Sequence, residues 1–440
     1  MIDTNIYKTK KAAYYTLGCK LNFAETSQLG KQLSAAGYQK VHAGEQADIC
    51  IVNTCSVTDT ADHKCRQAIK RLKRQHPNAI MVVTGCYAQL NPEEIAGIDG
   101  VNLVLGAGEK FDVLEFIERW DAENSVEIHK TPIQKVKKFH PSCSGTDRTR
   151  YFLKVQDGCD YYCTYCTIPF ARGRSRNASI EETVKSAENA IVEGAKEIVL
   201  SGVNIGDFGK STGENFFDLV KALDALPGKV RFRISSIEPD LLTDDLIEYI
   251  AFSHHFMPHF HIPLQAGSNE ALHLMKRRYS TELFAHKVEV IKKYMPDAFI
   301  GVDVIVGTRG ETEELFEKSK NFISSLDISQ LHVFTYSERE GTKMIQMEQN
   351  VPLSERKRRS DELHLLSEQK TRLFYESQMG KYAEVLWEGR HNGSSMVGFT
   401  ANYIRVESPY EKKKVNTIEK IKLGGWNDQR TALLALAYEK

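Results

Sequence analysis

Short apolar runs alternate with helical patterns along residues 1–123, which we expect to form one domain. Three of the runs are strand-like, and each ends just before a cysteine: residues 13–17 precede Cys19, residues 49–52 precede Cys55, and residues 80–83 precede Cys86. Strands that alternate with helices predict a parallel α/β sheet. Open sheets of this kind bind ligands at the carboxyl ends of their strands. We therefore expect the three distant cysteines to converge on one point.

The helical segment after Cys55 has an apolar face and, opposite it, a basic face. Its apolar face includes Cys65, so we expect a core thiol there and exclude it as a metal ligand. The opposite face carries four cations and no interleaved acid, namely Arg66, Lys70, Lys73 and Arg74. A basic face is usually a solvated surface, and it is also a candidate contact to the phosphates of a nucleic acid.

Residues 146–370 continue the alternation of strands and helices after a polar segment, residues 124–145, that we expect to be a linker. The strand-like runs lie before Cys159 and at residues 198–201, 230–235, 259–262, 300–306 and 331–334. Repeated strand–helix units with right-handed crossovers favour a barrel, here a partial (β/α)6 barrel. Its chemistry is expected at the carboxyl ends of the strands.

The hydrophobic pattern takes a period of two in residues 371–440, where short segments alternate apolar and polar positions. Closely spaced short strands predict a small antiparallel β-barrel of the kind that often binds oligonucleotides. The whole sequence is therefore expected to be α/β, with an N-terminal parallel sheet, a central partial barrel and a C-terminal β-barrel.

Composition narrows the class of protein. A chain of 440 residues has room for two or three domains, and no apolar run approaches the ~20 residues of a membrane span. The polar N-terminus does not resemble a signal peptide, so we expect a cytoplasmic protein that does not enter a membrane. Nine cysteines without a secretion signal indicate metal or redox chemistry rather than disulfides. A formal net charge of zero argues against indiscriminate nucleic-acid binding but allows local basic patches.

The strongest motif is the tight triad Cys159, Cys163 and Cys166, which follows an apolar strand-like run. Four thiolates usually hold a [4Fe-4S] cluster, so a triad leaves one iron free to chelate a small molecule. The alternatives are a structural zinc site or buried free thiols, but zinc normally needs a fourth ligand and no further pair follows nearby. The triad, with the aromatic Tyr165 inside its last pair, resembles the signature of the radical S-adenosylmethionine superfamily. That resemblance implies a [4Fe-4S] cluster that binds S-adenosylmethionine.

Small polar residues follow the predicted barrel strands and are candidates for contacts to this cofactor. With the motif residue Tyr165 they form the set Tyr165, Gly202, Asn204, Ser236, Glu238 and Gln265. Singly these are weak signals, because such residues are also ordinary turn formers. Arg172 and Arg174 come just after the triad and are candidate contacts to RNA, with a solvated turn as the alternative.

Together these features resemble the methylthiotransferase family, which has an N-terminal domain with three distant cysteines, a radical S-adenosylmethionine barrel and a C-terminal TRAM domain. Segments 16–22, 53–57 and 84–89 carry the resemblance beside the Cys159 triad. Segments 19–22, 235–239 and 397–403 look most like the branch that acts on N6-threonylcarbamoyladenosine in tRNA. One departure is segment 307–312, where the family commonly has Gly-Phe-Pro-Gly-Glu-Thr.

The resemblance implies two [4Fe-4S] clusters, an auxiliary one on Cys19, Cys55 and Cys86 and a radical one on the Cys159 triad. One S-adenosylmethionine would methylate a sulfur on the auxiliary cluster. A second would be cleaved to a radical that abstracts hydrogen from C2 of the adenine, which then receives the methylthio group. The implied partners are a tRNA anticodon stem-loop and a flavodoxin- or ferredoxin-like electron donor.

Two alternatives remain open. A related branch of the family modifies an aspartate of a ribosomal protein. A non-catalytic iron–sulfur protein that binds RNA or carries electrons would not consume S-adenosylmethionine, so formation of 5′-deoxyadenosine separates it from an enzyme.

Overall fold

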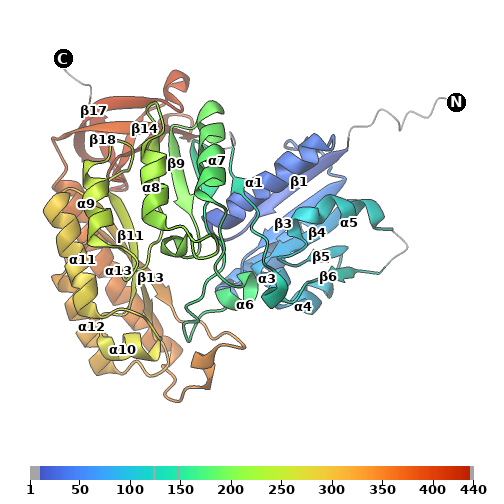
Figure 1. Cartoon of the computed structure of the whole chain (residues 1–440), viewed down its shortest axis with the longest axis horizontal. Helices are drawn as coiled ribbons and strands as arrows, with labels where there is room; N and C mark the ends of the chain where they lie inside the picture. Colours follow the sequence, from blue (N-terminus) through green and yellow to red (C-terminus); the bar gives the residue numbers. More distant parts are fainter. Residues whose placement is uncertain (1–9, 122–124, 146–147, 437–440) are drawn as a thin grey trace.

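The computed structural model describes residues 10–121, 125–145 and 148–436. An N-terminal α/β unit lies beside a larger unit of strands and helices, and a small β-barrel packs on one end of the larger unit (Figure 1). This arrangement confirms the expected α/β class. Among the described residues, no helix has both the length and the apolar character that crossing a membrane requires.

The N-terminal unit is a six-stranded parallel sheet in the order β2-β1-β3-β4-β5-β6. Every residue of the central strand β3 is buried, as expected for a strand covered on both faces. The strands are β1 (Lys11–Thr16), β2 (Gln39–Lys40), β3 (Ile49–Thr54), β4 (Ile80–Gly85), β5 (Leu103–Leu105) and β6 (Glu127–His129). The helices are α1 (Lys20–Ala35), α2 (Asp59–Gln75), α3 (Cys86–Leu90), α4 (Pro92–Ala96) and α5 (Val113–Arg119).

The segment expected as a linker contributes an edge strand to each of two sheets. Strand β6 pairs with β5 of the N-terminal sheet, and β7 (Ser142–Cys143) pairs antiparallel with β8 (Arg150–Lys154) of the central unit. These edge strands are short and polar, which is why the hydrophobic pattern did not predict them.

The central unit contains the six expected parallel strands, in two sheets ordered β10-β9-β8-β7 and β11-β12-β13. Isolated bridges such as Ser236 with His261 connect the two sheets, which confirms a partial barrel. The remaining strands are β9 (Glu197–Ser201), β10 (Arg231–Ile234), β11 (His259–Gln265), β12 (Phe299–Val306) and β13 (Gln330–Thr335). The helices are α6 (Ile168–Arg172), α7 (Ile180–Val192), α8 (Phe216–Asp224), α9 (Asp244–Phe252), α10 (Asn269–Leu274), α11 (Thr281–Tyr294), α12 (Glu313–Ser325) and α13 (Leu353–Glu376).

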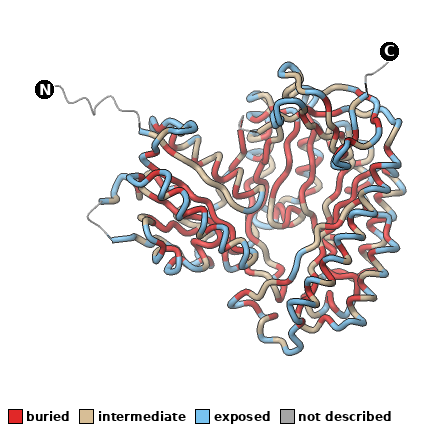
Figure 2. Tube along the Cα trace, turned by 180° about the vertical axis from the view of Figure 1, so that it is seen from behind, coloured by how far each residue is buried: buried red, intermediate tan, exposed pale blue. Residues whose placement is uncertain are grey.

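Burial follows these layers. The strands are largely buried, and the outer helices expose one face each (Figure 2). Helix α1 of the N-terminal unit packs against β7 and β8, and an ion pair between Asp62 of α2 and Arg339, beyond β13, joins the two units a second time.

The C-terminal unit is a closed barrel in the order β14-β15-β16-β18-β17, as expected, although the β16–β18 pairing is parallel. Its strands are β14 (Tyr382–His391), β15 (Ser395–Thr400), β16 (Arg405–Pro409), β17 (Ile418–Trp426) and β18 (Leu433–Leu436). Trp387 is fully buried in its core. The barrel packs on the central unit, where Arg233 of β10 donates to the backbone carbonyl of Ala401.

Candidate functional site

The structure brings Cys19, Cys55 and Cys86 together at the carboxyl edge of the N-terminal sheet. They follow β1, β3 and β4, and β3 lies between the other two strands. Burial, together with the neighbouring thiols of Cys86 and Cys19, raises the pKa of the Cys55 thiol to about 12. Gly18 permits this approach, because its φ of +98° suits glycine and an added Cβ would lie 2.7 Å from Cys55 Cβ.

Cys159, Cys163 and Cys166 lie in the loop after β8, at the carboxyl end of the central barrel. Burial, together with Cys163 and Cys159, raises the pKa of the Cys166 thiol to about 12. The guanidinium of Arg277 donates to Cys163 Sγ at 3.0 Å and pairs with Glu238. This cation favours a thiolate at Cys163, as a metal ligand requires.

Neither cysteine triad is among the groups of side chains whose ligand atoms lie close enough together to hold a single metal ion. In the part of the chain that the structure describes, the one ligand group whose atoms all lie within 4.8 Å of one another is His261, Asp303 and His332. Zinc–sulfur bonds of about 2.3 Å would draw three thiolates closer than this.

The expected cofactor residues lie around the second triad. Tyr165 is near it, with its hydroxyl 3.5 Å from Arg277 Nη1. Gly202 and Asn204 follow β9, Ser236 and Glu238 follow β10, and Gln265 ends β11 with a φ of +65°. The amide N and O of Asn204 are both buried without a hydrogen-bond partner, and the hydroxyl of Ser235 is in the same state. Such groups are costly unless a ligand satisfies them, so the site fits a small polar molecule beside the thiols.

Sequence reasoning missed Gln156, which shapes this site through the backbone. Its Oε1 accepts from the N–H groups of Val203 and Asn204, both at 2.9 Å. An added Cβ at Gly202 would lie 2.9 Å from the same oxygen. A glutamine beyond a strand has no distinctive spacing, so nothing in the sequence marked it.

The expected RNA contact at Arg172 is wrong. Its side chain is buried and forms ion pairs with Glu25 at 3.0 Å and Asp157 at 2.9 Å. Lys110 and Lys154 complete the cluster around Glu25. Burial would raise the pKa of Glu25, but these three cations hold it well below its ordinary value. Arg172 is thus a structural cation between two domains.

The exposure and the pairing of Arg174 and of the basic face of α2 agree only in part with the expectation of free surface cations. Arg174 is 78% exposed and pairs loosely with Asp160 at 3.3 Å. Lys70 and Arg74 are exposed and Lys73 is half-buried. The expectation of an acid-free face is wrong at Arg66, which pairs at 2.8 Å with Glu94 of α4. On the apolar face Cys65 is fully buried, and its thiol donates to the Cys55 carbonyl at 3.4 Å.

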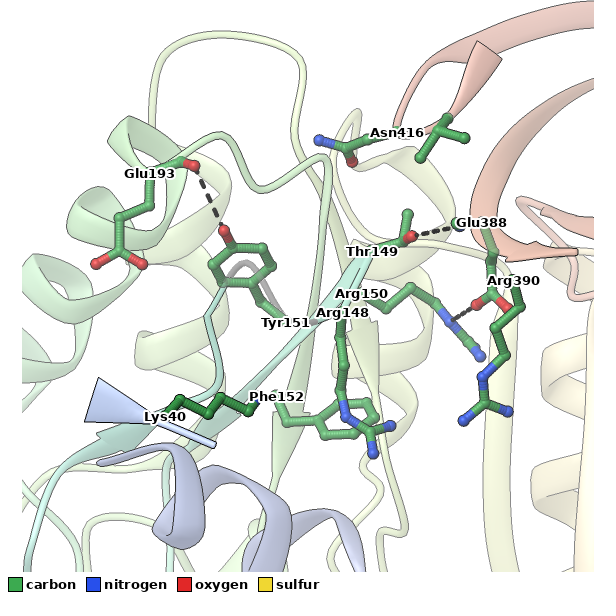
Figure 3. Close-up of a pocket in the computed structure, with 12 residues that line it drawn as sticks. Lys40, Arg148, Thr149, Arg150, Tyr151, Phe152, Glu193, Glu388, Arg390 and Asn416 are labelled. Carbon is green, nitrogen blue, oxygen red and sulfur yellow. Dashed lines mark hydrogen bonds and ion pairs between the residues drawn. The ribbon is translucent and has the colours of Figure 1, made fainter. Parts of the chain in front are cut away.

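A second basic region lies in a cleft of about 560 Å³ where the three units meet (Figure 3). Lys40 comes from the N-terminal unit, Arg148 and Arg150 precede and begin β8, and Arg390 comes from β14. Arg150 is held by Glu388 at 2.8 Å. No pattern in the sequence predicted this cleft, because its cations come from three separate units.

The chain is similar to known proteins over nearly its whole length. Residues 11–106 match the "Uncharacterized protein family UPF0004" and residues 153–323 match the radical SAM superfamily. Threonylcarbamoyladenosine tRNA methylthiotransferase MtaB of Bacillus subtilis is 38% identical, over 93% of each chain. A tRNA-2-methylthio-N(6)-dimethylallyladenosine synthase of Desulfitobacterium hafniense is 31% identical, over 94% of each chain. The solved radical S-adenosylmethionine methyltransferase TsrM of Kitasatospora setae shares the fold, with a TM-score of 0.54, 14% identity and coverage of 74% and 73%.

Proposed function

The chain belongs to the radical S-adenosylmethionine tRNA methylthiotransferase family, and from this premise we propose that its substrate is N6-threonylcarbamoyladenosine next to the anticodon, methylthiolated at C2. One observation carries the proposal: the relative named for this nucleoside is 38% identical over 93% of the chain, against 31% for the relative named for dimethylallyladenosine. A ribosomal-protein aspartate remains the alternative substrate.

We infer two iron–sulfur clusters, each held by one cysteine triad. Cys159, Cys163 and Cys166 would hold the cluster that the radical SAM superfamily implies, and Cys19, Cys55 and Cys86 would hold the second. When bound, the clusters and S-adenosylmethionine supply the radical and methyl-transfer chemistry. The chain itself supplies six thiols, of which those of Cys55, Cys86 and Cys163 are buried, and Arg277 places a positive charge at Cys163.

Polar groups at the strand ends are suited to bind S-adenosylmethionine. The unpartnered amide of Asn204 and hydroxyl of Ser235 can hydrogen-bond its polar atoms. Gln156 orients the backbone next to Asn204. Tyr165, Gly202, Ser236, Glu238 and Gln265 surround the same strand ends and remain candidate contacts.

We propose that the RNA backbone lies along exposed cations of more than one domain. Lys70 and Arg74 of α2, Arg174 after the radical triad, and Lys40 and Arg390 of the cleft are the candidates. Phosphate contacts of this kind fix the position of the RNA and leave the choice of base to the interior of the site. A flavodoxin- or ferredoxin-like protein would supply electrons.

The test is a reaction of cluster-reconstituted protein with S-adenosylmethionine, a chemical reductant and anticodon stem-loop RNA. One RNA carries N6-threonylcarbamoyladenosine and another carries N6-dimethylallyladenosine. We expect 5′-deoxyadenosine and a methylthio nucleoside only from the first RNA. Methylthiolation of the second RNA instead would assign the chain to the other substrate, and no 5′-deoxyadenosine with any RNA would favour a non-catalytic protein.

A further inference from the structure

A cavity of about 340 Å³, lined by charged, imidazole and aromatic side chains, lies within the central barrel, between the strands and the C-terminal unit. Its walls come from all three units: Lys20 begins α1, His261, Asp303 and His332 lie on β11 to β13, and Tyr403 follows β15. Lys20 is the residue directly after Cys19, so one wall of the cavity comes from the segment that carries a proposed auxiliary ligand. Its size is sufficient for a polar substituent of a nucleotide base.

The charges in this cavity are paired except for one. Arg233 forms two hydrogen bonds with Glu197, and Arg150 pairs with Glu388. Asp303 hydrogen-bonds His261 at 2.6 Å. No hydrogen bond or ion pair engages the ammonium of Lys20 within the described ranges. Nδ1 of His259, a residue only 7% exposed, also lacks a partner. The cavity therefore presents an unpaired cation and an unsatisfied imidazole.

The local potential is positive. Burial would raise the pKa of the Tyr403 phenol, yet Arg150, Lys20 and Arg233 lower it. Burial, followed by Arg233 and Lys20, holds the pKa of His259 well below its ordinary value. A positive potential favours an anionic ligand and disfavours a metal cation at His261, Asp303 and His332.

We propose that this cavity binds the threonylcarbamoyl substituent of the substrate adenosine, with the Lys20 ammonium as the partner of its carboxylate. The inference rests on the proposed function. The neutral imidazoles and the Tyr403 hydroxyl are suited to the urea and hydroxyl groups of the substituent. In adenine, C6 and C2 flank the same nitrogen. Because Lys20 follows Cys19 in the chain, a substituent bound at Lys20 would direct this edge of the base toward the segment that carries the auxiliary triad.

The same chemistry excludes a hydrocarbon substituent. A dimethylallyl group has no atoms to pair with Lys20 or His259 and would bury both without compensation. The cavity thus discriminates between the two substituents, because the wrong one leaves the polar groups of the cavity without hydrogen bonds. This kind of selectivity is stronger than that of an apolar pocket.

The experiment compares two stem-loop RNAs, one with the natural carboxylate and one in which a carboxamide replaces it. Dissociation constants and kcat/KM are measured with cluster-loaded wild type, Lys20→Met and Lys20→Arg. We expect wild type to prefer the carboxylate by about 10- to 100-fold, the range for a hydrogen bond to a charged group. Lys20→Met should lose this preference while its affinity for the carboxamide RNA stays within about twofold, and Lys20→Arg should keep most of it. An unchanged preference in Lys20→Met overturns the proposal.

Three controls keep the outcome decisive. Lys318→Met removes an exposed lysine of α12 that pairs with Glu270 and should change nothing. Iron content is measured in every variant, and His332→Leu tests the cavity away from the cluster loop, with an expected loss of about 5- to 10-fold for threonylcarbamoyl RNA alone. The wild-type protein could bind this RNA with the carboxylate preference but form no methylthio product. That result would refute the proposed function without contradicting the proposed binding of the substituent. If cluster-loaded wild type retains zinc and His332→Leu loses it, the cavity is a metal site, and the proposal that it binds the substituent is overturned.

Discussion

The guanidinium of Arg172 and the carboxylate of Glu25 form an ion pair of 3.0 Å, with side chains only 5% and 2% exposed. The pair joins α6 of the central unit to α1 of the N-terminal unit. Arg172 also donates to Asn22, whose amide donates to the carbonyl groups of Leu17 and Thr54. These carbonyls lie next to the loops that carry Cys19 and Cys55. One buried cation thus positions the auxiliary triad relative to the barrel.

Arg172→Met should destabilise the protein strongly. Glu25 keeps Lys110 and Lys154 as partners in this variant, so the loss should lie above that of the control and below the about 3–5 kcal/mol typical of a buried charge left without a partner. The free energy of unfolding in guanidinium chloride measures the effect. Arg66→Met is the matched control, because its pair with Glu94 is partly exposed and should contribute about 0–1 kcal/mol. Equal losses in the two variants would contradict a special role for the buried pair.

The same cluster predicts a loss of stability in acid. Arg172, Lys110 and Lys154 outweigh burial and hold the pKa of Glu25 well below its ordinary 4.5. The folded pKa is depressed, so this contribution is complete above the unfolded pKa and disappears as the pH falls through the folded value. We expect the unfolding midpoint of wild type to fall steadily below about pH 5. Glu25→Gln should show a lower midpoint near neutrality and a shallower decline, and parallel curves would exclude Glu25 as a source.

Iron analysis tests the two triads separately. Reconstituted wild type should hold about eight irons per chain, four for each cluster. Joint replacement by alanine of Cys159, Cys163 and Cys166, or of Cys19, Cys55 and Cys86, should leave about half of the iron. Iron that is unchanged in either triple variant would show that the corresponding triad holds no cluster.

Cys65→Ala separates a core thiol from a ligand. Cys65 is fully buried and donates to the Cys55 carbonyl, but it lies on the helix face that packs against the sheet. The variant should retain all its iron and lose about 1 kcal/mol of stability, as expected for a small truncation and one weak hydrogen bond. Loss of iron comparable to that of the Cys55 triad variant would make Cys65 a ligand.

Chain order explains what could be predicted from the sequence. Each of Cys19, Cys55 and Cys86 directly follows a strand, so parallel pairing alone brings them to one edge. In the sequence Arg172 looks like an ordinary surface cation. Its partner Glu25 lies 147 residues earlier, so no local pattern reveals that the two residues form a pair. The acid at Arg66 likewise comes from another helix. The cavity at Lys20 needed all three units in place before its unpaired charge could be recognised.

The last prediction concerns the basic face of α2. Lys70 and Arg74 are exposed, so replacing both by alanine should weaken tRNA binding without changing which nucleoside is modified. Each phosphate contact that is lost should reduce the slope of log affinity against log salt by about 0.7–0.9. Arg66→Ala is the control, because Glu94 already neutralises that guanidinium and the slope should change less. Affinities measured across a salt series decide the matter. Lines of equal slope and affinity for wild type and the double variant would make this face a solvated surface, and the phosphate contacts would then lie at Arg174 and in the cleft that Lys40 and Arg390 line.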